Sequence, residues 1–213
     1  MTPASPLHLT AARPLHRLRQ WLMAAREWRQ RRYAAPSPGY VKLQVLLRNG
    51  VADATWVETG TYLGDTTAFL SRHARQVYSI EPAPALFEQA QRRFRRTPHV
   101  HILAGTSEQQ LPQLLPTLSG DVNFWLDGHY SAGMTYQGSV DTPIVSELGC
   151  IESHLARYRN VVVLVDDVRC FDPSIAEFAQ YPPVDFLVDW ARRNRCRWHI
   201  EHDIFVARKL AEA

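Results

Sequence analysis

The fold of this chain is decided by residues 55–67, which read TWVETGTYLGDTT. Residues 55–58 form a strand-like run that leads into a turn containing Gly60 and Gly64, and a helical pattern starts at Asp65. In sheets of parallel strands, ligands bind at such turns, outside the carboxyl ends of the strands. The stretch therefore predicts the first strand, the ligand-binding turn and the first sheet-covering helix of an α/β domain.

The remaining chain repeats this alternation of short apolar runs and helical segments. Such a pattern is typical of a doubly wound, Rossmann-like sheet whose strands are mostly parallel. Only Asp203 separates the last two runs, too little for a helical crossover, so they predict an antiparallel C-terminal hairpin at the edge of a seven-stranded sheet. The expected strands are 55–58, 77–81, 100–103, 122–126, 161–165, 197–202 and 204–207, and the helices between them are 65–74, 83–94, 107–115, 142–158 and 184–194.

The composition fits one folded domain with a short extension. Of the 213 residues, 46% are hydrophobic and 21% are charged, which excludes a disordered chain. No apolar run approaches the roughly 18 residues that a membrane-spanning helix needs. Cys150, Cys170 and Cys196 are too scattered for a disulfide framework or a zinc cluster. Because the start of the chain also lacks a secretory signal pattern, we expect a cytoplasmic protein.

Positive charge is concentrated at the N-terminus. Residues 1–50 hold nine basic residues and one acid, a net charge of +8, whereas 15 basic and 20 acidic residues give the remainder −5. Residues 14–32 carry apolar side chains at helical spacing among arginines, which predicts a basic amphipathic helix. Two prolines and a glycine at 36–39 end it. We therefore divide the chain into a helical leader and linker, 1–38, and a domain, 39–213, that opens with a short helix over 40–48.

Two interpretations of the leader helix remain open. In the favoured one, the helix docks its Trp and Leu stripe on the domain or on a second subunit. Docking on a second subunit would make the protein a homo-oligomer. The other uses the arginines to contact an anionic membrane surface or a nucleic acid, and it is not favoured.

An acid at the end of the second expected strand gives the glycine turn its significance. Glu81 lies 21 positions after Gly60, where a carboxylate can accept hydrogen bonds from both ribose hydroxyls of a nucleoside. The turn has the spacing Glu-x-Gly-x-x-x-Gly, not G-x-G-x-x-G, which disfavours a nicotinamide dehydrogenase. Residues 105–107, Gly-Thr-Ser, follow the third strand and could contact a purine edge or cap the next helix through Ser107.

Three aspartates follow the fourth and fifth expected strands: Asp127, Asp166 and Asp167. Carboxylates crowded at one sheet edge repel one another unless a cation or protons intervene, and an all-oxygen set suits Mg²⁺, Mn²⁺ or Ca²⁺. A divalent ion is thus the first explanation. The alternative is that Asp166 and Asp167, being adjacent, point to opposite faces of the strand. Both can face one ion only if the chain leaves strand geometry there.

Taken together, these residues resemble the class I S-adenosylmethionine-dependent methyltransferases over about residues 40–209. In this sequence Tyr62 stands where the family usually has the central glycine of the turn. The resemblance implies S-adenosylmethionine as the cofactor, with the methionine part at the first-strand acid and turn and the ribose at Glu81. The expected cofactor-binding residues are Glu58, Gly60, Thr61, Gly64, Glu81, Thr106, Ser107 and Asp127.

A narrower resemblance rests on three motifs: Glu-Thr-Gly-x-x-x-Gly, Leu-Asp-Gly-His and Val-Asp-Asp. These are similar to metal-dependent sugar O-methyltransferases of the macrocin O-methyltransferase type. The similarity implies a magnesium ion on Asp127, Asp166 and Asp167. It also implies His129 as the catalytic base, where the relatives have an aspartate. The expected reaction is metal-assisted methylation of a hydroxyl on a sugar or another small polar metabolite.

Residues 130–141 are polar, contain two glycines and are long for an internal connection, so we expect them to cover the substrate. Two alternatives to the metal-dependent enzyme remain. One is a metal-free class I methyltransferase, and the other is a non-catalytic adaptor that retains the fold. An adaptor would have no use for three aspartates at one edge.

Overall fold

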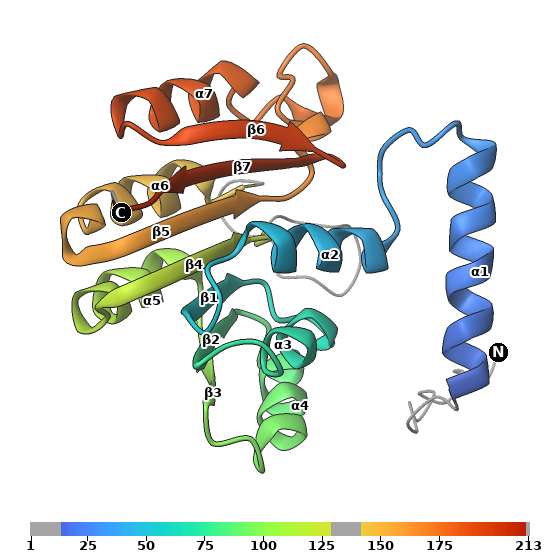
Figure 1. Cartoon of the computed structure of the whole chain (residues 1–213), viewed down its shortest axis with the longest axis horizontal. Coiled ribbons are helices and arrows are strands. Elements are labelled where there is room, and N and C mark those ends of the chain that lie inside the picture. The colour runs from blue at the N-terminus through green and yellow to red at the C-terminus, as the bar shows by residue number, and fades with distance from the viewer. Residues whose placement is uncertain (1–13, 129–141, 212–213) are drawn as a thin grey trace, which may run out of the picture.

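The protein, seen in a computed structural model that describes residues 14–128 and 142–211, is built on one seven-stranded sheet (Figure 1). The strand order is β3-β2-β1-β4-β5-β7-β6. Strands β1 to β5 run parallel, and β7 is antiparallel to β5 and to β6. This confirms the expected fold. The strands are β1 (Thr55–Thr59), β2 (Gln76–Glu81), β3 (Val100–Ala104), β4 (Gly120–Leu126), β5 (Tyr158–Val165), β6 (Arg197–Glu201) and β7 (Ile204–Lys209).

Helices cover both faces of the sheet, because the central strands are apolar on both sides. Trp56, Trp125 and Leu164 pack in one apolar core, whereas their neighbours in sequence, Val57 and Phe124, pack in the other. Helices α2 to α4 contribute to the first core and α5 to α7 to the second. The helices are α1 (Pro14–Gln30), α2 (Gly39–Asn49), α3 (Asp65–Leu70), α4 (Pro84–Phe94), α5 (Ser107–Leu114), α6 (Ile144–Glu152) and α7 (Val184–Arg193).

Two helices are shorter than the sequence predicts. The helix expected over 65–74 ends at Leu70, and the one expected over 142–158 ends at Glu152. After α6 the chain forms a single 3-10 turn and already enters β5 at Tyr158. The buried phenol of Tyr158 donates a hydrogen bond of 3.0 Å to the Leu115 carbonyl, which ties the start of β5 to the end of the neighbouring helix region. A helical pattern alone does not show this tertiary contact.

The leader helix α1 stands beside the domain and is joined to it through the linker before α2 (Figure 1). The ring of Trp28, near the C-terminal end of α1, lies 5.7 Å from the ring of His202. In the middle of α1, the ring of Trp21 lies 6.1 Å from that of Tyr40. Leu22 remains 63% exposed. Within residues 14–128 and 142–211, no helix has the length and apolar character needed to cross a membrane.

Candidate active site

The turn after β1 lies at the carboxyl edge of the sheet, tied to β2. The N–H groups of Gly60 and Thr61 both donate to the Ile80 carbonyl, at 3.0 and 3.2 Å. Gly60 has φ of +91°, and a Cβ there would lie 2.7 Å from the carbonyl oxygen of Asp127. Only glycine combines this conformation with this close approach. The turn therefore sits directly against the end of β4.

Tyr62 adopts a left-handed conformation, with φ of +48°, in the place of the family's central glycine. Its N–H donates a 2.7 Å hydrogen bond to Oε2 of Glu81, and the N–H of Ala83 donates one of 2.9 Å to Oε1. Burial raises the pKa of Glu81, although these two hydrogen bonds act in the opposite direction. The carboxylate is thus held at the end of β2, and each oxygen has a second lone pair that can accept a hydroxyl proton.

Glu58 is fully buried at the end of β1, beneath the turn. The hydroxyls of Thr67 and Ser79 each donate a 2.6 Å hydrogen bond to its Oε2. Among the residues that the structure describes, none donates a hydrogen bond to Oε1. Burial raises the pKa of Glu58 to about 7, despite the two hydroxyl donors. A buried oxygen that receives no hydrogen bond from the described residues fits a site in which a polar ligand or an ordered water supplies the donor.

The helix after β3 is capped by Thr106 and not by Ser107, the cap that the sequence suggested. Thr106 precedes α5, and its N–H donates a 3.2 Å hydrogen bond to the side chain of Gln109. Ser107 is buried at the start of the helix. A purine contact by Thr106 and Ser107 stays a prediction.

The aspartates that follow β4 and β5 lie at the same edge of the sheet, the carboxyl edge, as expected. The N–H of Asp127 donates to the Thr59 carbonyl at 3.2 Å, and that of Asp166 donates to the Leu126 carbonyl at 3.0 Å. The hydrogen bonding between β1 and β4 therefore continues to Asp127, and that between β4 and β5 continues to Asp166. The chain then leaves strand geometry, because Asp167 has φ of +54°.

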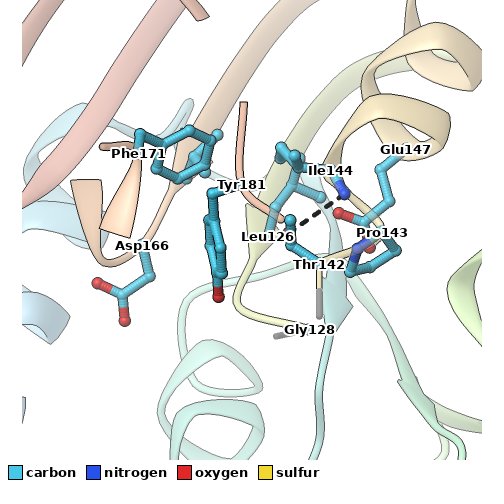
Figure 2. A pocket seen from close by; sticks show the side chains of 10 residues that line it. Leu126, Gly128, Thr142, Pro143, Ile144, Glu147, Asp166, Phe171 and Tyr181 are labelled. Carbon is cyan, nitrogen blue, oxygen red and sulfur yellow. Dashed lines mark hydrogen bonds between the residues drawn. The ribbon is translucent and has the colours of Figure 1, made fainter. Parts of the chain in front are cut away.

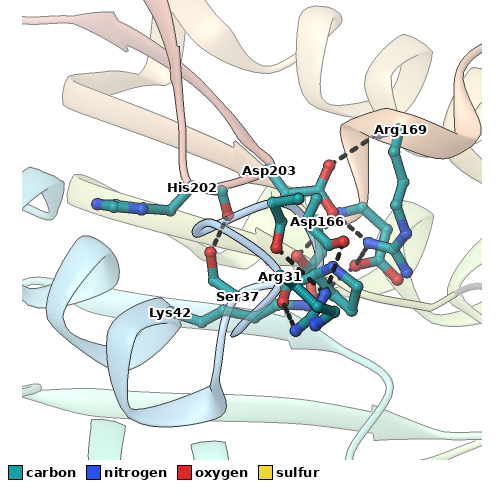
Figure 3. Close-up of polar contacts among 11 residues, drawn as sticks. Arg31, Ser37, Lys42, Asp166, Arg169, His202 and Asp203 are labelled. Carbon is teal, nitrogen blue, oxygen red and sulfur yellow. Dashed lines mark hydrogen bonds and ion pairs between the residues drawn. The ribbon is translucent and has the colours of Figure 1, made fainter. Parts of the chain in front are cut away.

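This turn brings Asp166 and Asp167 to one side, where both contact a lysine from α2 (Figure 3). The Nζ atom of Lys42 lies 2.6 Å from Oδ2 of Asp166 and 2.9 Å from Oδ1 of Asp167. The alternative in which the two acids point to opposite faces is therefore wrong. Burial by itself would lower the pKa of Lys42, but the charges of Asp166 and Asp167 outweigh it and raise the pKa above its ordinary value. Lys42 is consequently an ammonium ion.

The contacts of the two acids extend to a second cation. Nη1 of Arg169 lies 2.6 Å from Oδ1 of Asp167, and the same guanidinium pairs with Asp203, in the turn between β6 and β7. Asp203 also accepts the Arg169 N–H, and its carbonyl accepts the N–H of Val168. These contacts hold the left-handed turn at Asp167 in place.

This arrangement does not fit the expected magnesium ion. Over residues 14–128 and 142–211, no group of three His, Cys, Asp or Glu residues is placed to hold a metal. Oδ2 of Asp166 accepts a hydrogen bond from Nζ of Lys42, and its Oδ1 accepts one of 2.8 Å from the N–H of Asp167. The ammonium group of Lys42 already occupies the space between the two carboxylates, where a magnesium ion would have to lie about 2.1 Å from their oxygens.

A small pocket opens beside Asp166 (Figure 2). It lies between the ends of β4 and β5 and the first turn of α6. Figure 2 shows Tyr181 and Phe171 on one side of it and Glu147 on the other. Its lining combines carboxyl and phenol groups with apolar side chains. The lining residues are Leu126, Gly128, Thr142, Pro143, Ile144, Glu147, Val165, Asp166, Phe171 and Tyr181.

Two sequence predictions lie outside the described residues: the base His129 and the substrate-covering segment 130–141. Conversely, the sequence interpretation missed Lys42, because its partners are more than 120 residues away. One signal could have found it. Lys42 shares a helix face with Val45 and Leu46, so it lies on the stripe that faces the sheet.

No family model matches the sequence, and no curated protein matches it. Solved structures do match the fold. An O-methyltransferase from Bacillus cereus, solved with S-adenosylhomocysteine, is 16% identical, with 95% of this chain and 92% of that one covered and a TM-score of 0.54. The N-methyltransferase NodS from Bradyrhizobium japonicum is 14% identical, with 81% and 96% covered and a TM-score of 0.54.

A third structure, the 23S rRNA methyltransferase ErmE, is 11% identical, with 84% of this chain and 70% of that one covered and a TM-score of 0.50. At these identities the likeness concerns the fold, which is that of the S-adenosylmethionine-dependent methyltransferases. The three matched proteins methylate different kinds of acceptor according to their names, so the shared fold leaves the acceptor to be argued from the site.

Proposed function

We propose that this protein is an S-adenosylmethionine-dependent O-methyltransferase that acts on a hydroxyl of a sugar or another small polar metabolite. The observation that carries the proposal is the carboxylate of Glu81, fixed by two backbone N–H groups at the end of β2 beside the turn after β1. A carboxylate held there is placed to accept both ribose hydroxyl protons of a nucleoside. The likeness to methyltransferase folds supports S-adenosylmethionine as that nucleoside.

The expected cofactor-binding residues lie on adjoining elements of this edge, which supports their assignment. The turn containing Gly60, Thr61 and Gly64 would hold the methionine part above Glu58, whose open Oε1 fits a polar group or a bridging water. Asp127 lies against Gly60. When bound, S-adenosylmethionine supplies an electrophilic methyl group on a positively charged sulfur. The chain's own contribution is to orient the two reactants in line, which can contribute many powers of ten to the rate.

The acceptor would enter from the side of the aspartates and the pocket beside Asp166. Carboxylate oxygens accept hydrogen bonds from hydroxyl groups, which favours a polyhydroxylated acceptor. The reacting hydroxyl must lose its proton as its oxygen bonds to the methyl carbon. His129 is our candidate to take that proton, since it follows Asp127 by two residues and imidazole titrates near neutrality. No step is assigned to the magnesium ion expected from the sequence, because the contacts of Asp166 and Asp167 do not fit it.

Calorimetric titration of the full chain with S-adenosylmethionine tests the proposal, in EDTA and in excess Mg²⁺, with sinefungin as a non-reactive control ligand. We expect micromolar binding in both buffers. Glu81→Gln should weaken it by about tenfold or more, because hydrogen bonds to a charged acceptor contribute about 1.5–3 kcal/mol. Glu88→Gln, on the outer face of α4, is the matched control and should bind like the parent. Absence of binding in both buffers would refute the proposal.

A further inference from the structure

Helix α2 holds Lys42 in a fixed position relative to the sheet. Val45 and Leu46, one turn further along the same face, are fully buried in the core between α2 and the strands. At the far end of the helix, the side-chain amide of Asn49 donates a 2.5 Å hydrogen bond to Glu201, at the end of β6. Because both anchors lie on the side that faces the sheet, the Lys42 side chain extends over the carboxyl end of β5 and is only 19% exposed.

The acids that Lys42 contacts are buried anions that need a positive partner. The side chains of Asp166 and Asp167 are 2% and 10% exposed. Buried carboxylates that lie side by side are strongly destabilising unless a cation compensates them. Lys42 bridges the two acids, and it is also attracted by the charge of Asp127. Figure 3 shows Lys42, Asp166, Arg169 and Asp203 gathered at this point.

We infer that Lys42 is the resident cation of this acidic edge: its ammonium group positions Asp166 and Asp167 and occupies the place that a divalent ion would take. The inference rests on the proposed function only in treating the edge as the active site. Lys42 lies between the two carboxylates, in the space that a metal ion bound to both would take, and its ammonium group repels a cation. A divalent ion therefore binds these aspartates only when Lys42 is removed. An acceptor hydroxyl that reaches this edge contacts an ammonium group and not a metal ion.

The test is a titration of the full chain with Mn²⁺, followed by electron paramagnetic resonance, in the absence of S-adenosylmethionine. Lys42→Met should bind one Mn²⁺ at least about tenfold more tightly than the parent, because the substitution removes the repulsion between a unit positive charge and an ion a few ångströms away. Adding Asp167→Asn to Lys42→Met should abolish the gain. Arg48→Met removes a charge from the same helix, at its ion pair with Glu201, and should behave like the parent.

The effect of Mn²⁺ on thermal unfolding gives a second measurement, because a purely structural role of Lys42 would lower the midpoint of the variant without making it respond to Mn²⁺. Lys42→Met should unfold at a lower temperature than the parent, and Mn²⁺ should raise the midpoint of the variant but not that of the parent. Lys42→Arg keeps the charge and should bind Mn²⁺ as weakly as the parent. If Lys42→Met does not fold, Lys42→Gln, which is neutral and polar, replaces it with the same expectation.

One result would overturn the inference: equal Mn²⁺ affinity of the parent and the neutral variants, whether both bind the ion or neither does. Because the measurements contain no S-adenosylmethionine, a failure of the proposed methyltransferase function would leave their outcome unchanged, so the two failures can be distinguished.

Discussion

Gly60 lies so close to Asp127 that a Cβ on the glycine would be 2.7 Å from the aspartate's carbonyl oxygen. The contact joins the turn after β1 to the end of β4, and Gly60 also has φ of +91°. Gly60→Ala should therefore lower the free energy of unfolding by about 3 kcal/mol, from backbone strain and overpacking together. It should also abolish S-adenosylmethionine binding.

Urea unfolding checks this prediction against a glycine that has free space around it. A Cβ on Gly39, at the start of α2, would meet nothing within 4 Å. Gly39→Ala should thus change the free energy of unfolding by no more than about 1 kcal/mol. If both variants unfold like the parent, the result would contradict the close contact between Gly60 and Asp127.

The buried carboxyl of Glu58 makes stability depend on pH in an unusual direction. Its pKa is about 7 in the folded protein and near 4.5 in the unfolded chain, because burial disfavours the charged form. Between these values the folded state binds more protons than the unfolded state. The free energy of unfolding should therefore fall by about 3 kcal/mol as the pH rises from 4.5 through 7, since each pKa unit corresponds to about 1.4 kcal/mol.

Denaturant titrations of the parent and Glu58→Gln at pH 5 and pH 8 isolate this effect. The variant cannot ionise, so the parent should lose more stability than the variant over this interval. Glu88→Gln is the control for an exposed glutamate and should follow the parent. Equal losses for the parent and Glu58→Gln would contradict a raised pKa at Glu58.

Asp167 should affect turnover much more than cofactor binding. Asparagine keeps the size of the side chain and tolerates the left-handed conformation, so Asp167→Asn should fold. It removes one of the carboxylates at the edge where we propose that the acceptor binds, and we expect kcat to fall by about a hundredfold or more, the scale of an electrostatic contribution at an active site. The Kd for S-adenosylmethionine should stay within a few-fold of the parent's.

Asp121→Asn is the matched control for that prediction. Asp121 lies at the start of β4, at the opposite edge of the sheet, where it pairs with Arg159. Its variant should retain the parent's turnover. A large loss of cofactor affinity in Asp167→Asn would instead move Asp167 to the cofactor site.

The sequence predicted those features that depend on local pattern. The alternation of apolar runs and helices predicted the sheet and its terminal hairpin. The positions of Glu81, Asp127 and Asp166 at strand ends followed from the same alternation, because parallel strands end at one edge. Helix ends were less accurate: the sequence extended the helix over 142–158, but α6 ends at Glu152, and Tyr158 begins β5 with its phenol bonded to the Leu115 carbonyl.

Features that depend on distant contacts were not predictable. The turn at Asp167 is fixed by the hairpin residue Asp203, which binds Arg169 and accepts the N–H of Val168. The role of Lys42 depends on how α2 packs on the sheet. No local pattern in the sequence joins Lys42 to Asp166, which lies 124 residues away.

Hydrogen–deuterium exchange with and without S-adenosylhomocysteine tests most directly whether the carboxyl edge of the sheet is a cofactor site. We predict slower exchange in peptides that cover residues 58–64 and 81–83, where the N–H groups of Tyr62 and Ala83 hold Glu81. Peptides from the β6–β7 hairpin, residues 197–209, should exchange at the same rate in both conditions. Unchanged exchange at 58–64 and 81–83 at saturating ligand would contradict the account.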